Sequence, residues 1–425
     1  MSAKQSSQVW IPGISLCRRV EVENNDLMSF QFASGVSNSM GVEDALDSVF
    51  FQIREGFSSE KADLAILFTT GHFADSCVDI SRRINETFSP TCMVGCTAGG
   101  VIGSDQEYED QAALALLVGN LPECQLNSFH LTHQNVSGIG DAAIAAEILG
   151  ARPDEDPSFV LLPDPFSIQT GDLLSKLDSV YPGAPKLGGL ASAGFQPGSN
   201  RLYLNEDTHM EGLVGFSLTG PLEILPVVSQ GCRPIGRPLM VTDAERNVIK
   251  TLGNRSAFEV LQEIVSELSE EDQRLASTAL LTGVVIDEYK TDFDQGDFLI
   301  RNLIGGDPER GYLVINDHIS LGQTMQFQVR DANTAEEELS ILLNHHLARL
   351  GIKKPVAAAV FNCNGRGLKL FPERNHDIEM IQTATGGIPS AGFFCAGEIG
   401  PVGGQTFIHG FTSSIGLFVP KQDVE

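Results

Sequence analysis

Apolar runs and helical patterns follow each other in the same order three times along this chain. Each copy has an apolar run typical of a buried strand, a loop, an amphipathic helix, a proline, a short strand, a turn of small residues and a closing strand. Opening strands are expected at residues 64–68, 159–162 and 356–361, helices at 75–88, 170–181 and 377–385, turns at 97–100, 191–194 and 392–400, and closing strands at 113–119, 212–218 and 407–418. This recurrence predicts an internal repeat.

The stretch between the second and third copies has a different pattern. Four prolines within residues 221–238 indicate a connection rather than a compact element. Beyond them, helical spacing predicts helices at 257–268 and 334–350, and apolar runs predict strands at 280–286, 298–303, 311–314 and 325–329.

Some neighbouring strands are separated by helices and others only by tight turns, which excludes a purely doubly wound parallel sheet. We therefore predict an α+β fold. Its mixed or antiparallel sheets are layered with helices, built from recurring strand-helix-strand-turn-strand units and arranged in two halves.

Composition sets the class of protein and of partner. The 425 residues are 42% apolar, which is enough for two domains with full cores. With 28 basic and 55 acidic residues the formal net charge is −27, which argues against nucleic acid or an anionic membrane surface as a partner.

Targeting and redox signals are consistent with a cytoplasmic protein. No apolar run reaches the roughly 18 to 20 residues that a membrane span needs, so we expect no membrane insertion. The N-terminus lacks the pattern of a signal peptide, and the eight cysteines show no tight spacing, so we interpret them as reduced thiols. Cys92 and Cys96 have no second ligand pair nearby, and we expect no metal site.

Glycines and reactive side chains gather near the C-terminus, in residues 361–367, 375–377 and 391–404. Because glycine lets a ligand approach the backbone closely, this cluster is the best candidate for a binding site. The predicted ligand-binding set is Asn362, Cys363, Arg366, His376, Asp377, Gly397, Glu398 and His409. An arginine and an acid that converge from two loops would suit the two charged ends of an amino acid, with Arg366 as a fork for the carboxylate and Glu398 for the ammonium group.

Each of these residues also has a structural interpretation. Arg366 could bind loop carbonyls or Glu398, Asp377 could cap the helix that begins beside it, and His409 could be a satisfied core histidine. Cys363 could be a small core residue, or a nucleophile with His376 or His409 in a hydrolase or transferase. No nucleophile elbow or phosphate-binding motif is present, and we predict no catalytic residue.

The C-terminal residues resemble the C-terminal part of the FIST domain. The resemblance lies in Gly365-Arg366-Gly367, His376-Asp377, Gly392-Phe393-Phe394, Gly397-Glu398-Ile399-Gly400-Pro401 and His409-Gly410-Phe411, with an upstream segment that includes Arg301-Asn302. The motif at Val94 to Gly100 and the one at Gly188 to Ser192 resemble the family's N-terminal part. The resemblance implies an N-terminal arm and first strand at residues 1–27, a FIST N-terminal domain at 28–248, a FIST C-terminal domain at 249–420 and a tail at 421–425.

The resemblance also implies a function. Members of the FIST family look like sensory modules, and amino acids are the ligands usually suggested for them. Some stand-alone members are haem-binding sensors of nitric oxide. We therefore expect a sensor that binds a small amino-acid-like ligand between its two halves and acts through a separate signalling protein such as a histidine kinase. Haem, if bound, would be non-covalent, because the chain has no Cys-x-x-Cys-His motif.

Overall fold

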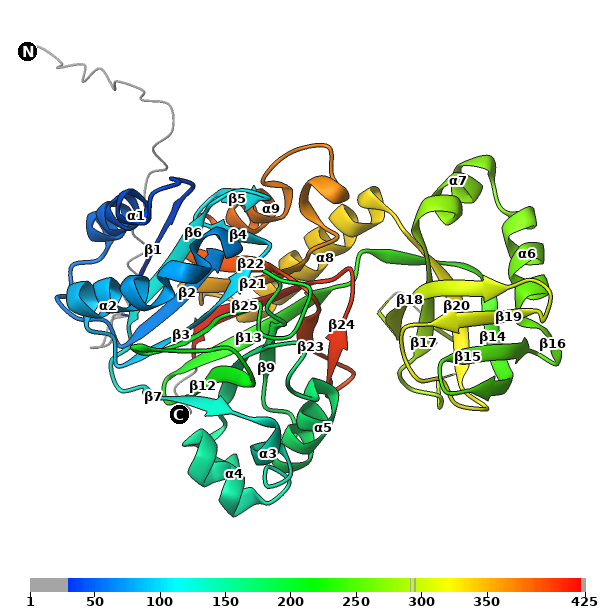
Figure 1. Cartoon of the computed structure of the whole chain (residues 1–425), viewed down its shortest axis with the longest axis horizontal. Helices are drawn as coiled ribbons and strands as arrows, with labels where there is room; N and C mark the ends of the chain where they lie inside the picture. The colour runs from blue at the N-terminus through cyan, green and yellow to red at the C-terminus, as the bar shows by residue number, and fades with distance from the viewer. Residues whose placement is uncertain (1–29, 291, 294–295, 422–425) are drawn as a thin grey trace, which may run out of the picture.

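The structure is a computed structural model that describes residues 30–290, 292–293 and 296–421. A large body of three sheets is joined to a smaller barrel, which is formed by residues between β13 and α8 (Figure 1). The predicted arm and first strand at residues 1–27 and residues 422–425 of the predicted tail lie outside the described residues. The boundary expected at residue 248 stays a prediction.

The three sheets of the large body have the same strand order. The first sheet consists of β1 (Gln31–Ser37), β6 (Leu114–Asn120), β2 (Leu64–Thr70), β3 (Cys92–Ala98), β10 (Leu202–Leu204) and β11 (Asp207–His209). The second consists of β7 (Gln125–Leu131), β12 (Leu213–Thr219), β8 (Ser158–Pro163), β9 (Lys186–Gly189), β23 (Glu398–Val402) and β24 (Gln405–His409). The third consists of β13 (Leu222–Ser229), β25 (Ser413–Pro420), β21 (Ala357–Cys363), β22 (Ser390–Cys395), β4 (Gly100–Gly103) and β5 (Gln106–Glu109).

The predicted repeat is confirmed in these sheets. In each one the two central strands, β2 with β3, β8 with β9 and β21 with β22, are parallel, and the closing strand pairs antiparallel with the first of them. The following hairpin then pairs with a different copy: β4–β5 joins the third sheet, β10–β11 the first and β23–β24 the second. The three copies are therefore interlocked by exchanged hairpins, and the fold class is the predicted α+β fold.

Three glycines occupy equivalent places in the second strand of each copy. Gly95, Gly188 and Gly392 stand opposite Leu67, Leu161 and Val360 on the neighbouring parallel strand. A Cβ added at any of the three would overlap the carbonyl oxygen of that opposite residue. These glycines lie inside strands rather than in turns, and the close approach of two backbones requires them.

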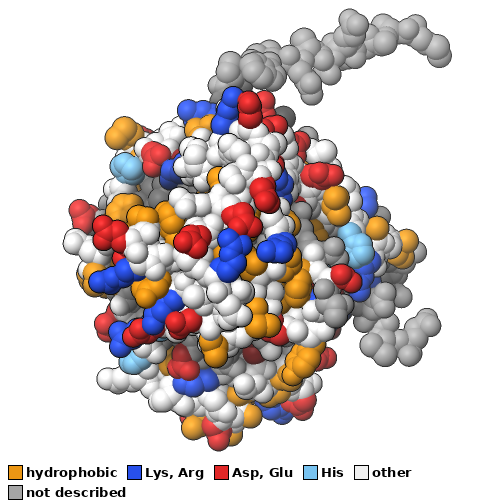
Figure 2. All heavy atoms as spheres, turned by 90° about the vertical axis from the view of Figure 1, so that its right-hand side faces the viewer, with side chains coloured by type: hydrophobic (Ala, Val, Ile, Leu, Met, Phe, Trp, Pro, Cys, Tyr) orange, Lys and Arg blue, Asp and Glu red, His pale blue; other side chains and the backbone are white. Residues whose placement is uncertain are grey.

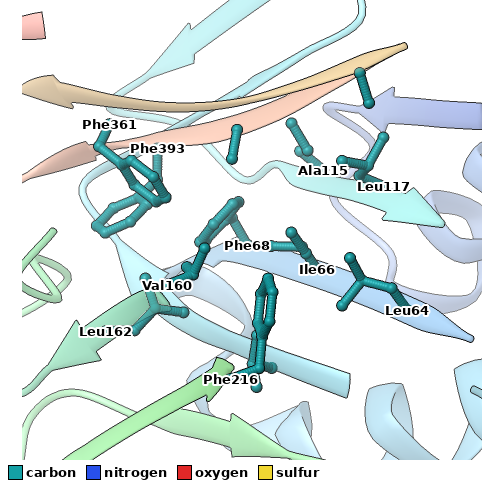
Figure 3. Packing of buried hydrophobic residues seen from close by; sticks show 14 of the residues in the cluster. Leu64, Ile66, Phe68, Ala115, Leu117, Val160, Leu162, Phe216, Phe361 and Phe393 are labelled. Atoms are coloured by element: carbon teal, nitrogen blue, oxygen red, sulfur yellow. The ribbon is translucent and has the colours of Figure 1, made fainter. Parts of the chain in front are cut away.

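The sheets share one core and are covered outside by helices. Phe68 of β2 packs against Phe393 of β22, with ring centroids 4.7 Å apart, and against Phe361 of β21, while Val160 and Leu162 of β8 complete the cluster (Figure 3). The outer faces are covered by α1 (Val42–Gly56) and α2 (Cys77–Phe88), by α3 (His133–Val136), α4 (Ala142–Leu149) and α5 (Thr170–Val180), and by α8 (Ala332–Leu350) and α9 (His376–Thr385).

The smaller body is a closed barrel. Its strands, in order, are β14 (Cys232–Glu245), β20 (Thr324–Arg330), β17 (Leu280–Val285), β18 (Phe298–Asp307), β19 (Tyr312–Ile315), β15 (Val248–Leu252) and β16 (Arg255–Ser256). Pairing of β14 with β15 closes the ring, and α6 (Ala257–Glu267) and α7 (Glu270–Ala279) pack on it. Acidic, basic and apolar side chains are interspersed on the face of the molecule drawn in Figure 2.

Two predictions about strands were wrong. The proline-rich segment contains the strands β13 and β14 instead of a connection. Strand β13 lies at the edge of its sheet, where Pro226 can do without the N–H that a central strand would need. In β14 the register shifts between Ile235 and Leu239, around Pro238. The closing strand expected at residues 407–418 is two strands, β24 and β25, which belong to different sheets. The turn expected at 392–400 is likewise short, because β22 ends at Cys395 and β23 begins at Glu398.

Candidate functional site

A cleft of about 990 Å³ lies where the barrel meets the large body. The barrel side is formed by residues 299–302 of β18 and by Asn316 and Asp317. The large body contributes α5, β24, the end of β21 and the turn after β22. Cys363, Gly397 and His409 of the predicted binding set line this cleft.

Backbone connections and side-chain contacts join the two bodies beside the cleft. The chain enters the barrel through Gly231, which has a left-handed φ of 66°, and leaves it after Arg330. The Arg330 guanidinium donates to the Gly365 carbonyl at 2.8 Å and lies 5.1 Å from the ring centroid of Phe411. The barrel is thus attached directly to the loop that contains Arg366.

His409 places an unsatisfied nitrogen at the cleft wall. Its Nε2 lies 2.9 Å from the Gly400 carbonyl, which assigns the ring proton to Nε2 and leaves Nδ1 as an acceptor. Nδ1 is buried and has no hydrogen-bond partner among the described residues. Burial, and then the nearby Arg301, lower the pKa of His409 to about 4, against the opposing effect of the Gly400 bond. The ring is therefore neutral at physiological pH.

Glu398 and Cys363 form a neutral pair behind this wall. Glu398 is fully buried, its Oε2 accepts from the Thr412 amide at 3.1 Å, and its Oε1 has no hydrogen-bond partner among the described residues. Burial raises the pKa of Glu398 well above its ordinary value, so the carboxyl group keeps its proton at neutral pH. Burial and the neighbouring Glu398 raise the pKa of the Cys363 thiol to about 12, which is the opposite of what a nucleophile requires.

Arg366 is held inside the protein by Asp377. The guanidinium is fully buried, with Nε 2.6 Å from Oδ2 and its second terminal nitrogen 2.9 Å from Oδ1 of Asp377. Burial alone would raise the pKa of Asp377, but the guanidinium outweighs it and holds that pKa at about 2. The remaining terminal nitrogen of Arg366 is buried without a partner among the described residues. The internal partner of Arg366 is thus Asp377, not the Glu398 that the sequence suggested.

Asn362 and His376 complete this buried network. Asn362 donates to Asp377 at 2.9 Å and accepts from the Ser413 hydroxyl at 2.7 Å. His376 Nδ1 lies 3.1 Å from Asp377, and its ring stacks on Phe371. Asp377 does not cap α9, which starts at His376 after Asn375, because its carboxylate faces inward to Arg366.

The predicted residues therefore fall into two adjoining groups. Cys363, Gly397 and His409 line the cleft with Glu398 directly behind them, whereas Arg366, Asp377, Asn362 and His376 form the network under the loop. Arg366 is near enough to both Cys363 and Glu398 to lower the pKa of each, so the two groups interact electrostatically.

Sequence reasoning missed a cation on the opposite wall. Arg301 of β18 lines the cleft, and its Nε binds Asp317. One terminal nitrogen donates to the carbonyls of Ile300 and Ile408, at 3.0 and 3.2 Å, while the other has no hydrogen bond among the described residues. The motif Arg301-Asn302 was visible in the sequence, but nothing local showed that it would face β24 across a cleft.

Asp178 of α5 supports the wall from the side. It accepts from the Thr406 amide at 2.6 Å and from the Thr406 hydroxyl at 2.8 Å, and it pairs with the buried Lys186 at 2.9 Å. These contacts hold the exchanged hairpin β23–β24 against α5.

In the part of the chain that the structure describes, no group of three or more His, Cys, Asp or Glu side chains is placed to hold a metal ion. Within the same residues, no helix has the length and apolar character needed to cross a membrane.

Comparisons with known proteins agree with the sequence motifs. The model of the FIST N domain matches residues 63–255, and that of the FIST C domain matches residues 257–401. An uncharacterized protein of Mycobacterium tuberculosis is 39% identical over 387 residues, which are 91% of this chain and 98% of that protein. An uncharacterized protein of Mycobacterium bovis is 37% identical over 391 residues, 92% of this chain and 99% of that protein.

Proposed function

The chain belongs to the FIST family, whose domains are associated with sensory signal transduction, and from this premise we propose that it is a sensor for a small amino-acid-like ligand that binds in the cleft between the barrel and the large body. The observation that supports the proposal most is the placement of Cys363, Gly397 and His409, three of the predicted binding residues, on one wall of that cleft.

Unsatisfied buried atoms indicate where the ligand's amino group binds. Buried polar atoms in native proteins nearly always have a partner, so an orphaned one calls for a ligand or a water molecule. Glu398 and His409 are directly opposite each other in the β23–β24 pair, so their side chains share one face of the hairpin. Glu398 Oε1 and His409 Nδ1 are both orphaned among the described residues. An ammonium group would donate to Nδ1 of His409, which lines the cleft, while the neutral Glu398 lies behind the wall and does not line the cleft.

Arg301 is the partner that we propose for the ligand's carboxylate. Its unused terminal nitrogen belongs to a wall built by the barrel, opposite the wall that contains His409. A guanidinium binds carboxylates through directed, charge-assisted hydrogen bonds. A ligand held by Arg301 of the barrel and by His409 of the large body would bind both bodies at once and strengthen their contact, which Arg301 already makes with the Ile408 carbonyl.

The signal would pass to a separate protein in the cytoplasm, such as a histidine kinase. Arg330 joins the barrel to the loop of Arg366, so a shift of the barrel on ligand binding would move that loop and the helix α9 beyond it. The net charge of −27 supports a protein partner rather than nucleic acid.

Haem is a second candidate ligand, favoured by His409 alone. A neutral imidazole with an unprotonated, unpartnered nitrogen on a cleft wall fits the requirement for an axial ligand. Bound haem would supply an iron that binds a diatomic gas, and His409 would be the residue that holds it. Absorption spectra after haem reconstitution test this: we expect a Soret band that His409→Ala abolishes, and its absence in the wild type would remove this candidate.

Isothermal titration with the common amino acids tests the main proposal. We expect one or a few to bind the wild type, and Arg301→Ala to weaken binding by about 10- to 100-fold, because one charge-assisted hydrogen-bonding partner is worth about 1.5–3 kcal/mol. Arg310→Ala, which removes an exposed arginine of the same barrel, is the matched control and should bind as the wild type does. If no amino acid binds, or if both variants bind equally well, the proposal is wrong.

A further inference from the structure

Strand β24 lies at one edge of the second sheet, and the ligand cleft runs along its open edge. Residues from both faces of the strand line the cleft: Gln405, Phe407 and His409 from one face, and Thr406 and Ile408 from the other. A cleft that reaches both faces of an edge strand also passes its edge, where backbone groups have no neighbouring strand to pair with. The cleft therefore borders the backbone of β24 as well as its side chains.

Thr406 and Ile408 direct their backbone groups away from β23. Residues in an antiparallel pair alternate between facing the partner strand and facing away from it. The Thr406 amide donates to Asp178 of α5 at 2.6 Å, instead of to β23. The Ile408 carbonyl accepts from Arg301 at 3.2 Å. Pro401, which has no N–H to donate, stands opposite Thr406 in agreement with this pattern.

Two further backbone groups on this outer edge have no partner. The carbonyl of Thr406 and the N–H of Ile408 also face away from β23, and neither forms a hydrogen bond with any residue that the structure describes. Thr406 is buried, and a buried backbone group without a protein partner calls for a water molecule or a ligand.

The two unpaired groups lie between Asp178 and Arg301, which occupy the backbone groups on either side of them. A long added strand therefore cannot pair here, but a single residue can. In a parallel bridge, one residue donates its N–H to the residue before the one that it faces, and its C=O accepts from the residue after. A residue that faced Phe407 in this way would have its amino side toward Asp178 and its carboxyl side toward Arg301.

Phe407 would also be next to the side chain of such a ligand. Residues that face each other across two strands have their side chains on the same face of the sheet. The Phe407 ring is half-buried in the cleft wall, 6.3 Å from the His409 ring between centroids, and Phe411 is a second half-buried ring that lines the cleft. Aromatic rings in a cleft wall favour an apolar or aromatic group on the ligand.

We propose that the ligand is an α-amino acid with an aromatic or large apolar side chain, and that its main chain forms a one-residue parallel bridge with β24. Its amino group donates to the Thr406 carbonyl, which leaves two ammonium donors for other acceptors of the cleft. Its carboxylate accepts from the Ile408 N–H beside Arg301. This inference rests on the proposed function, because it uses the same cleft and the same arginine, and it adds the backbone of β24 as a partner of the ligand.

Two probes test the bridge on the wild type by isothermal titration. L-Phenylalanine and L-β-homophenylalanine have the same ring and the same charged ends, but the second has one more carbon between the ends and does not fit the spacing from Thr406 to Ile408. We expect it to bind at least about tenfold more weakly, the loss that corresponds to one hydrogen bond to a charged group. L-Aspartate and L-lysine should also bind more weakly than L-phenylalanine, because their charges would lie beside Phe407.

A pair of variants tests the backbone contact itself. Ile408→Pro removes the N–H, which the pairing with β23 does not use, and an edge strand accepts proline at such a position. Ile408→Ala also loses the isoleucine side chain but keeps the N–H, so it controls for the lost packing. We expect Ile408→Pro to bind L-phenylalanine at least about tenfold more weakly than Ile408→Ala. Circular dichroism checks that both variants fold, and if the proline variant does not, the comparison of the two probes on the wild type still decides.

The outcomes separate this inference from the proposed function. Equal affinity of the two probes for the wild type, or equal affinity of the two folded variants for L-phenylalanine, would overturn the bridge and leave the proposed function standing. Binding of aspartate or lysine in preference to phenylalanine would overturn the assigned class of side chain in the same way. Binding of no common amino acid at all would overturn both.

Discussion

At the scale of single residues, Arg366 and Asp377 form an ion pair in which both side chains are fully buried. Both side chains are buried, and two hydrogen bonds of 2.6 and 2.9 Å join them. A guanidinium taken out of water in this way is tolerated only because its carboxylate partner is also present. We therefore infer that this ion pair holds the loop behind Cys363 in place. Direct contact between Arg366 and a ligand stays a prediction.

Removal of one partner should be costly. We expect Arg366→Met to lower the free energy of unfolding by about 3–5 kcal/mol, because the Asp377 carboxylate would stay buried without its counter-charge. The double variant Arg366→Met with Asp377→Leu should recover much of the loss. Urea denaturation measures both, and equal destabilisation by the single and double variants would contradict this account of the pair.

His409 should make stability depend on pH. Its pKa is about 4 in the folded protein and near 6.5 in the unfolded chain, so between these values the unfolded state binds the proton first. Stability should therefore be fully present above pH 6.5 and fall as the pH is lowered toward 4, by about 3 kcal/mol in total. His409→Gln should flatten this part of the profile of unfolding free energy against pH. An unchanged slope in the variant would show that His409 does not titrate as described.

The sequence could not reveal these pairings. In the sequence, Asp377 stands where a residue that caps a helix would stand. Only the folded path of the chain between Arg366 and α9 brings its carboxylate to Arg366. Arg301 and His409 are more than 100 residues apart, and their placement on facing walls depends on how the barrel packs against β24. The glycine-rich strand ends, by contrast, pointed to Cys363 and Gly397, which line the cleft, and their contact with a ligand stays a prediction.

At the scale of elements, periodicity predicted the repeat well because each copy has its own strand, helix and strand in sequence. Helix α2 was expected at residues 75–88 and is found at Cys77–Phe88, and α8 was expected at 334–350 and is found at Ala332–Leu350. The exchange of hairpins was not predicted. Short strands such as β4 and β23 pair with strands of another copy. The alternation of apolar and polar residues within a strand does not show which distant strand it will pair with.

The three equivalent glycines should tolerate no side chain. Gly188→Ala should destabilise the protein by several kcal/mol or prevent folding, because the added Cβ would overlap the Leu161 carbonyl between two parallel strands. Gly171→Ala in α5 is the control: nothing lies within 4 Å of its added Cβ, and alanine should stabilise the helix by up to about 1 kcal/mol. Thermal unfolding compares them, and equal stability of the two variants would contradict the close-packed assignment.

At the scale of the whole molecule, the chain is two bodies with a cleft at their junction. The sequence correctly predicted an α+β fold in two halves, but the barrel is inserted between β13 and α8, so the last part of the chain returns to the large body and completes two of its sheets. Residues from both matched family models therefore share sheets, as β4 and β22 do. The proposed ligand would contact both bodies at this junction, and Arg330 connects the barrel to the loop of Arg366, which binds Asp377 of α9.

Hydrogen exchange with and without a saturating mixture of the common amino acids tests the central claim, ligand binding between the two bodies, most directly. We predict that the mixture slows exchange on both walls of the cleft at once, in residues 299–302 of the barrel and 405–412 of the large body, and that Arg301→Ala abolishes the effect. Unchanged exchange, or protection of one body alone, would contradict the account.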